Sequence, residues 1–125
     1  MIRENDFIKR ELQRLQVLLN KLIGLIVNAA DIDENLKNQL DKNFNKNFEI
    51  GFYDLLKMSD SDFRIQVNRW DETHLDQLSE LLITLYQKDK SQHYLKEKAL
   101  LILDYLELNS PVYSFQRLQW RNQLQ

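Results

Sequence analysis

The sequence predicts an all-α fold, a helical bundle of five to seven helices in one domain spanning residues 1–125. Only two glycines and one proline are present, which leaves little turn chemistry for β-hairpins. The chain is 43% hydrophobic and 29% charged, near the average for globular domains. Apolar residues recur at three- and four-residue spacing along most of its length. A chain of this size can bury a core of its own, and no segment rich in Pro, Gly or Ser divides it.

The first helix carries the strongest pattern, and we expect it to run from a cap at Asn5 or Asp6 to about Val27. Its apolar residues follow alternating four- and three-residue steps, which keeps them on one side of a helix. These residues, called the ridge below, are Ile8, Leu12, Leu15, Leu19, Leu22 and Ile26. With its apolar flanks the ridge covers an arc of roughly 160°, more than a narrow two-helix contact occupies. The first helix is therefore expected to have more than one neighbour.

The second helix is expected to start at Asp31 or Asp33. Its apolar residues are spaced by four, so the stripe drifts about 40° per step and suits a steep helix crossing. This stripe consists of Ile32, Leu36, Leu40, Phe44 and Phe48. Alternatively, the helix breaks in the Asn-rich stretch 43–47. Gly51 then separates it from a short element over residues 52–57.

Three further helices follow. Ser59, with Asp62 three residues later, reads as a cap for a short helix through Val67. Asp71 or Thr73 starts a leucine-rich helix that ends near residues 88–90. Ser91 is expected to cap the next helix, whose two apolar faces predict a place in the middle of the bundle. One face consists of Leu95, Ala99, Ile102 and Leu106, and the other of Tyr94, Leu101, Tyr105 and Leu108.

The last helix is predicted from the sequence Ser110-Pro111, with the serine as N-cap and the proline in the first helical position. Its apolar positions are Val112, Phe115, Leu118 and Trp120. Large aromatic residues often anchor interfaces. Tyr94, Tyr105 and Trp120 are accordingly candidates for an exposed recognition surface.

Charge and cysteine content narrow the function classes. The formal net charge of -2 argues against a protein that coats nucleic acid. The absence of cysteine excludes disulfides, thiolate nucleophiles and cysteine metal sites. The charged N-terminal sequence has no apolar signal region, and the longest apolar stretches are far shorter than the roughly 20 residues that cross a bilayer. A cytoplasmic location is therefore expected.

A basic stripe on the first helix suggests anion contact. Arg3, Arg10, Arg14 and Lys21 follow steps of seven, four and seven, so they share a face away from the ridge. Such a row can contact phosphates or anionic lipid head groups. Alternatively it is a solvated face whose charges pair with neighbouring acidic residues.

No residue set predicts a reaction. His74 and His93 are the only histidines, they lie 19 positions apart, and neither belongs to a motif such as His-Glu-x-x-His. Both are expected to be surface imidazoles at helix starts. We therefore expect no enzyme activity, no metal and no cofactor.

Three segments carry a family resemblance. They are Met1-Ile2-Arg3 before a leucine-rich helix, residues 54–63 (DLLKMSDSDF) and residues 94–101 (YLKEKALL). Together they resemble a bacterial domain-of-unknown-function family that pairs an N-terminal helix with tetratricopeptide-like helices. The resemblance implies one degenerate tetratricopeptide-like helix pair over residues 75–108, with Ala99 as its one obvious small residue, and it implies no catalytic residues.

Protein interaction is the function that these patterns predict, with a homodimer formed through the ridge of the first helix. The open alternative within this hypothesis is that later helices of the same chain cover the ridge. The alternative function is a weak anion-binding regulator that docks on nucleic acid or membrane through the basic stripe. No small-molecule substrate is evident.

Overall fold

A computed structural model describes residues 2–111 and 114–125, with side chains from residue 9 onward within these ranges. The described residues form seven α-helices and no strand, which confirms the predicted all-α bundle. The helices are α1 (Ile2–Asn28), α2 (Glu34–Phe48), α3 (Phe52–Leu56), α4 (Asp60–Val67), α5 (Glu72–Lys88), α6 (His93–Asn109) and α7 (Phe115–Gln123). None of the described helices is both long enough and apolar enough to cross a membrane.

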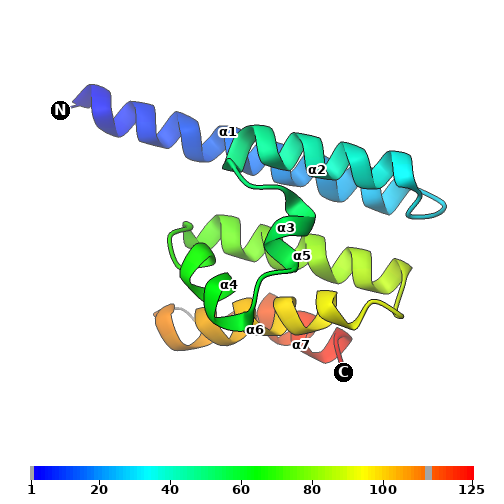
Figure 1. Cartoon of the computed structure of the whole chain (residues 1–125). Helices are drawn as coiled ribbons and strands as arrows, with labels where there is room; N and C mark the ends of the chain where they lie inside the picture. The colour runs from blue at the N-terminus through cyan, green and yellow to red at the C-terminus, as the bar shows by residue number, and fades with distance from the viewer. Residues whose placement is uncertain (1, 112–113) are drawn as a thin grey trace.

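The helices stack in layers (Figure 1). α1 and α2 form an antiparallel pair on one side of the molecule, and α6 with α7 lies on the opposite side. α5 lies between them and packs against α1, α6 and α7. The short helices α3 and α4 connect the two sides and contact α6.

α5 is the helix with the most buried residues, whereas the sequence predicts the middle position for the helix after Ser91; that helix, α6, has neighbours on several sides, namely α3, α4, α5 and α7. Nine residues of α5 are buried, and they include the polar side chains of His74, Gln77 and Ser79. α6 buries its first predicted face, but the second is only half-buried, and Leu108 at its end is 85% exposed. The buried face of α5 contains the polar residues His74, Gln77 and Ser79. The apolar stripe of α5 is therefore narrower in the sequence than that of α6, and the sequence did not indicate how deeply α5 is buried.

α2 is continuous through the Asn-rich stretch, so the predicted alternative of a break there is wrong. Asp33 is the N-cap, and its side chain accepts the Leu36 N–H at 2.8 Å. The amides of Asn43 and Asn47 donate to backbone carbonyls one turn earlier, at 2.8 and 2.7 Å. Their side chains therefore bond within the helix instead of ending it.

Two of the other predicted helix starts are confirmed and three are wrong. Ser59 caps α4 and Asp71 caps α5, each through its side chain. Ser91 does not cap α6, because both its N–H and its hydroxyl donate to the Asp89 carboxylate, at 3.2 and 2.5 Å. α6 instead begins at His93 after Gln92.

The remaining two errors concern the chain ends. α1 begins at Ile2, ahead of the expected Asn5 or Asp6 cap. α7 begins at Phe115 with Ser114 as its cap, because Ser110 ends α6 and its hydroxyl donates to Glu72 at 2.5 Å. The predicted apolar position Val112 lies outside the described residues.

Candidate interaction surfaces

The ridge of α1 divides into two parts. Leu19, Leu22 and Ile26 are 0–1% exposed within the single chain. These three are core residues, which corrects their assignment to an interface between molecules. Leu12 and Leu15 are only half-buried, and the side chain of Ile8 lies outside the described residues. The part of the ridge that this chain leaves accessible is therefore its N-terminal part.

The division follows from helix lengths. α1 has 27 residues and is about 40 Å long, whereas α2 has 15 and α5 has 17. α5 reaches α1 at Leu12, whose carbonyl lies 2.9 Å from Nε2 of His74. α2 ends beside Arg14, whose guanidinium donates to Asn47. Residues 2–11, the overhang below, extend past both α2 and α5 in the described structure (Figure 1).

Polar groups attach α1 to α5 where the overhang begins. The Gln77 amide nitrogen donates to the Gln16 carbonyl and to Oδ1 of Asn20, both at 2.9 Å. Oε1 of Gln77 is buried and has no hydrogen-bond partner among the described residues. Hydrogen bonds from α5 thus reach α1 at this end, where the ridge residues Leu12 and Leu15 are only half-buried.

The basic stripe is exposed but partly neutralised. Arg10, Arg14 and Lys21 are all exposed, and Arg3 lies outside the described side chains. Arg14 forms an ion pair with Glu11 as well as its bond to Asn47. The hydrogen bond from Arg14 holds the pKa of Glu11 below its ordinary value. Arg10 and Lys21 are therefore the two described members most accessible to an anion.

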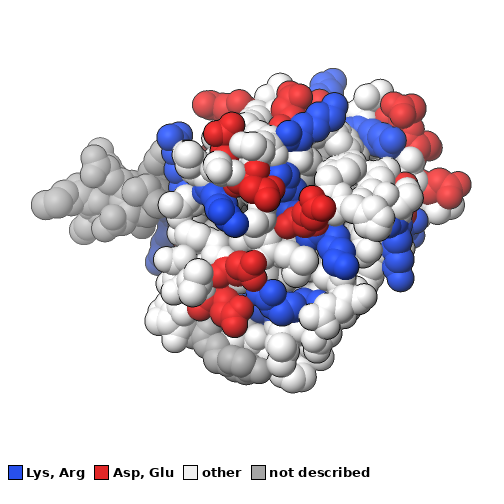
Figure 2. All heavy atoms as spheres, turned by 60° about the horizontal axis from the view of Figure 1, so that its bottom comes forward, with Lys and Arg blue, Asp and Glu red and all other residues white. Residues whose placement is uncertain are grey.

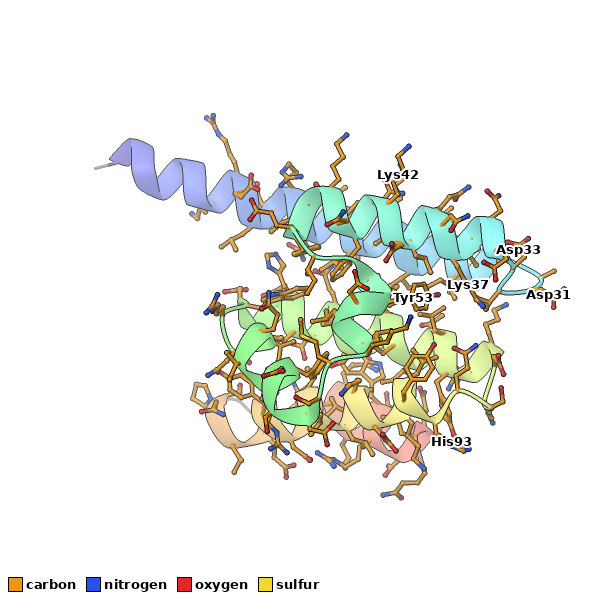
Figure 3. All side chains as sticks on the ribbon, viewed as in Figure 1. Asp31, Asp33, Lys37, Lys42, Tyr53 and His93 are labelled. Atoms are coloured by element: carbon orange, nitrogen blue, oxygen red, sulfur yellow. The ribbon has the colours of Figure 1, made fainter. Side chains whose placement is uncertain are left out.

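The histidines do not form a joint site. His74 is 3% exposed and hydrogen-bonded to α1, so its predicted surface position is wrong. His93 is exposed, as predicted, and lies at the end of the bundle away from the overhang (Figure 3). Within the described residues, no group of three or more His, Asp or Glu side chains could hold a metal ion.

Two other titratable side chains are held in place by the fold. Lys98 is buried, donates to the Met58 carbonyl at 2.6 Å and to Asp60 at 3.1 Å, and lies over the Phe63 ring. It joins α6 to the α3–α4 connection. Burial is the main cause that raises the pKa of Tyr53 to about 12 (Figure 3). The Tyr53 hydroxyl therefore keeps its proton at neutral pH.

A second surface, which the sequence analysis missed, joins α7 to α5 and α6. Arg117 donates to Asp76 from Nε and Nη2, at 2.7 and 2.8 Å, and to Glu72 at 2.7 Å. Arg121 donates to Asp104 at 2.7 Å and to Glu107 at 3.1 Å. On the face that α6 and α7 contribute to, acidic and basic side chains are interspersed (Figure 2).

Apolar contact contributes little to this surface. No residue of α7 is fully buried, but Trp120 is half-buried against the core, and Leu124, directly after the helix, is buried in it. Phe115 is 64% exposed and Leu118 is 41% exposed. A cavity of about 300 Å³ lies between α6 and α7, with Leu103 and Leu118 among its lining residues. α7 is thus held by its two arginines together with the core contacts of Trp120 and Leu124.

The aromatic residues proposed as a recognition surface are in a different environment. Tyr94, Tyr105 and Trp120 are each half-buried and pack against the core. The exposed large apolar residues at this end of the molecule are Leu108, Phe115 and Leu118. Exposure therefore identifies a different set from the one that the sequence predicted.

Comparison with known proteins adds no family. No family model, no curated protein and no solved structure matches this chain. The two surfaces described above are therefore the features of this chain that bear on its function.

Proposed function

We propose that the chain is a helical protein-interaction domain that self-associates through the N-terminal part of α1. The observation that carries this proposal is the overhang, which continues an amphipathic helix past the ends of α2 and α5. Most helical stability in proteins comes from packing of an amphipathic face, and neither α2 nor α5 extends along this segment (Figure 1). A second molecule that covers Leu12, Leu15 and the ridge position before them would supply such packing.

The charges of the overhang favour a second copy as the partner. Residues 2–11 contain three basic and three acidic residues, so the segment has no excess of either sign. The first half of the segment carries Glu4 and Asp6 with Arg3, a net charge of -1, and the second half carries Lys9 and Arg10 with Glu11, a net charge of +1. In an antiparallel pair of identical helices this order places the acidic half of one beside the basic half of the other. We infer an antiparallel homodimer.

The alternative proposal, anion binding through the basic stripe, has weaker support. The exposure of Arg10 and Lys21 favours it, but Arg14 is already engaged with Glu11 and Asn47. It predicts salt-sensitive binding to nucleic acid or anionic vesicles. That binding would be lost in Arg10→Glu/Lys21→Glu. The tetratricopeptide likeness of α5–α6, the family resemblance and the cytoplasmic location remain predictions alongside both proposals.

Molar mass at micromolar concentration tests self-association. Light scattering or sedimentation should give a dimer for the natural chain and a monomer for Leu12→Glu. The matched control is Val17→Glu, because Val17 is 68% exposed and lies on the opposite side of α1 from the ridge. The control should stay dimeric. A monomeric natural chain, or equal loss of association in both variants, would reject the proposal.

A second measurement covers the case in which Leu12→Glu unfolds the chain. Since the sequence has no cysteine, Lys9→Cys introduces one unique label site on the exposed surface of α1. Each copy then carries one spin label, and in an antiparallel dimer the distance between the labels of the two copies should have a single defined value. A background signal without a distance peak would contradict the pairing.

A further inference from the structure

We propose that the groove between α5 and α6 binds a helix that carries two arginines four residues apart, and that α7 occupies this groove as a displaceable intramolecular ligand. The occupant in trans is a basic amphipathic segment of another protein. This surface is separate from the overhang, so the proposal stands independently of self-association.

The groove suits such a helix because it carries two pairs of carboxylates, one pair on each of its two helices. Glu72 and Asp76 lie one turn apart on α5, and Asp104 and Glu107 lie one turn apart on α6. Arg117 pairs with the first two carboxylates and Arg121 with the second two. Each arginine therefore binds the carboxylates of one helix, and together the two arginines fix the register of the bound segment.

The Arg117 contact is the more specific of the two. Its side chain is only 13% exposed, and it meets Asp76 with two parallel hydrogen bonds. The hydrogen bonds to Asp76 are the main cause that raises the pKa of Arg117. A lysine cannot form the same two-pronged contact with a carboxylate. The groove should therefore prefer arginine at this position.

Three observations make α7 displaceable. Its helix contains no fully buried residue, so the apolar contacts that oppose its release are confined to the half-buried Trp120 and to Leu124 beyond the helix. The carboxylates that hold it are partly exposed, and ion pairs in such positions contribute little net free energy. The cavity of about 300 Å³ beside Leu118 shows that α7 is incompletely packed against α6. A segment with the same arginines and a larger apolar side chain would fit better.

Competition between a peptide and α7 tests the proposal. The probe is a labelled peptide of residues 114–125, added to the full-length chain. Arg117→Gln/Arg121→Gln weakens the docking of α7 and should raise the affinity for this peptide roughly tenfold, because the groove is then open for more of the time. The matched control is Arg64→Gln/Arg69→Gln, which makes the same charge change at two exposed arginines outside α7. It should bind the peptide as the natural chain does.

A peptide with both arginines replaced by glutamine should bind neither protein. Equal peptide affinity for the natural chain and the Arg117→Gln/Arg121→Gln variant would overturn the proposal. A dimer of the natural chain that disappears in this variant would also overturn it, since α7 would then be exchanged between two copies.

Hydrogen exchange of the natural chain provides a readout that needs no variant. The amides of residues 115–123 should exchange faster at high salt, while those of α5 and α6 stay protected. Protection of α7 equal to that of α5 at both salt concentrations would show that α7 is a fixed part of the core.

Discussion

At the scale of single residues, the two glycines have different roles. Gly24 lies inside α1, where a Cβ would meet nothing within 4 Å. Glycine in a helix interior is less favourable than alanine by about 1 kcal/mol. Gly24→Ala is therefore expected to raise the free energy of unfolding by about that amount. Denaturant titration measures the change.

Gly51→Ala is the comparison, with the opposite sign. A Cβ at Gly51 would lie 2.8 Å from Oδ2 of Asp54 and 3.0 Å from Oδ1 of Asp41. The same Asp41 oxygen accepts the Tyr53 N–H at 3.2 Å and so caps the start of α3. Displacing it should lower stability by about 1 kcal/mol. Equal effects of the two alanine substitutions would contradict this assignment.

Residue types also explain which of the predicted N-caps are confirmed. The predicted caps Ser59, Asp71 and Asp33 are confirmed, because each bonds to a backbone N–H two or three residues ahead. Ser91 has the same residue type as Ser59 but bonds to Asp89 instead. A serine before a helix can bond either to a backbone N–H of that helix or to a nearby side chain, and the path of the loop decides which of the two bonds forms.

At the scale of elements, the long helices were predictable and their neighbours were not. Periodicity identified α1 and α2, because a regular apolar stripe requires only local spacing. It did not indicate that α5 has the most buried residues, since His74, Gln77 and Ser79 are polar yet buried in that helix. Each bonds to a backbone carbonyl: those of Leu12, Gln16 and Leu75 respectively. Two of these carbonyls belong to α1, a partner that a single sequence does not specify.

The α7 surface was missed for a related reason. Arg117 and Arg121 are visible in the sequence, and so are two pairs of acidic residues, but each arginine contacts both members of one pair: Glu72 with Asp76, and Asp104 with Glu107. Matching them requires knowing that α7 folds back across α5, about 40 residues earlier in the chain. Spacing could have suggested the pair as one of several matches, but it could not select it.

The pH dependence of α7 docking is a prediction at this scale. Hydrogen bonds from Ser110 and Arg117 hold the pKa of Glu72 below its ordinary value of 4.5. A carboxylate with a lowered pKa favours the docked state above its ordinary pKa, and this preference is lost as the pH falls through the lowered value. α7 should therefore loosen below pH 4.5.

The indole N–H resonances of the two tryptophans measure this loosening. Trp120 lies on α7, whereas Trp70 stacks on Phe48 with ring centroids 4.5 Å apart. The Trp120 signal should shift at a higher pH than the Trp70 signal. In Glu72→Gln this early step should shrink. A common shift of both signals would mean that acid unfolds the whole chain at once.

At the scale of the whole molecule, the two proposed surfaces lie at different places on one core. The ridge residues Leu19, Leu22 and Ile26 fix α1 to the body, so association at the overhang acts on a helix that is already anchored. A partner molecule bound there does not need to order the rest of α1. If the proposed self-association occurs, folding and association are linked through a single continuous helix.

This linkage predicts that thermal stability depends on protein concentration. If the overhang pairs only in the folded state, mass action favours the folded dimer, and each tenfold rise in concentration contributes about 1.4 kcal/mol per dimer. The midpoint of thermal unfolding should rise with concentration for the natural chain and for Val17→Glu, and it should be constant for Leu12→Glu. The natural chain and both variants keep the buried ridge residues Leu19, Leu22 and Ile26. A concentration dependence that persists in Leu12→Glu would therefore place the association on another surface.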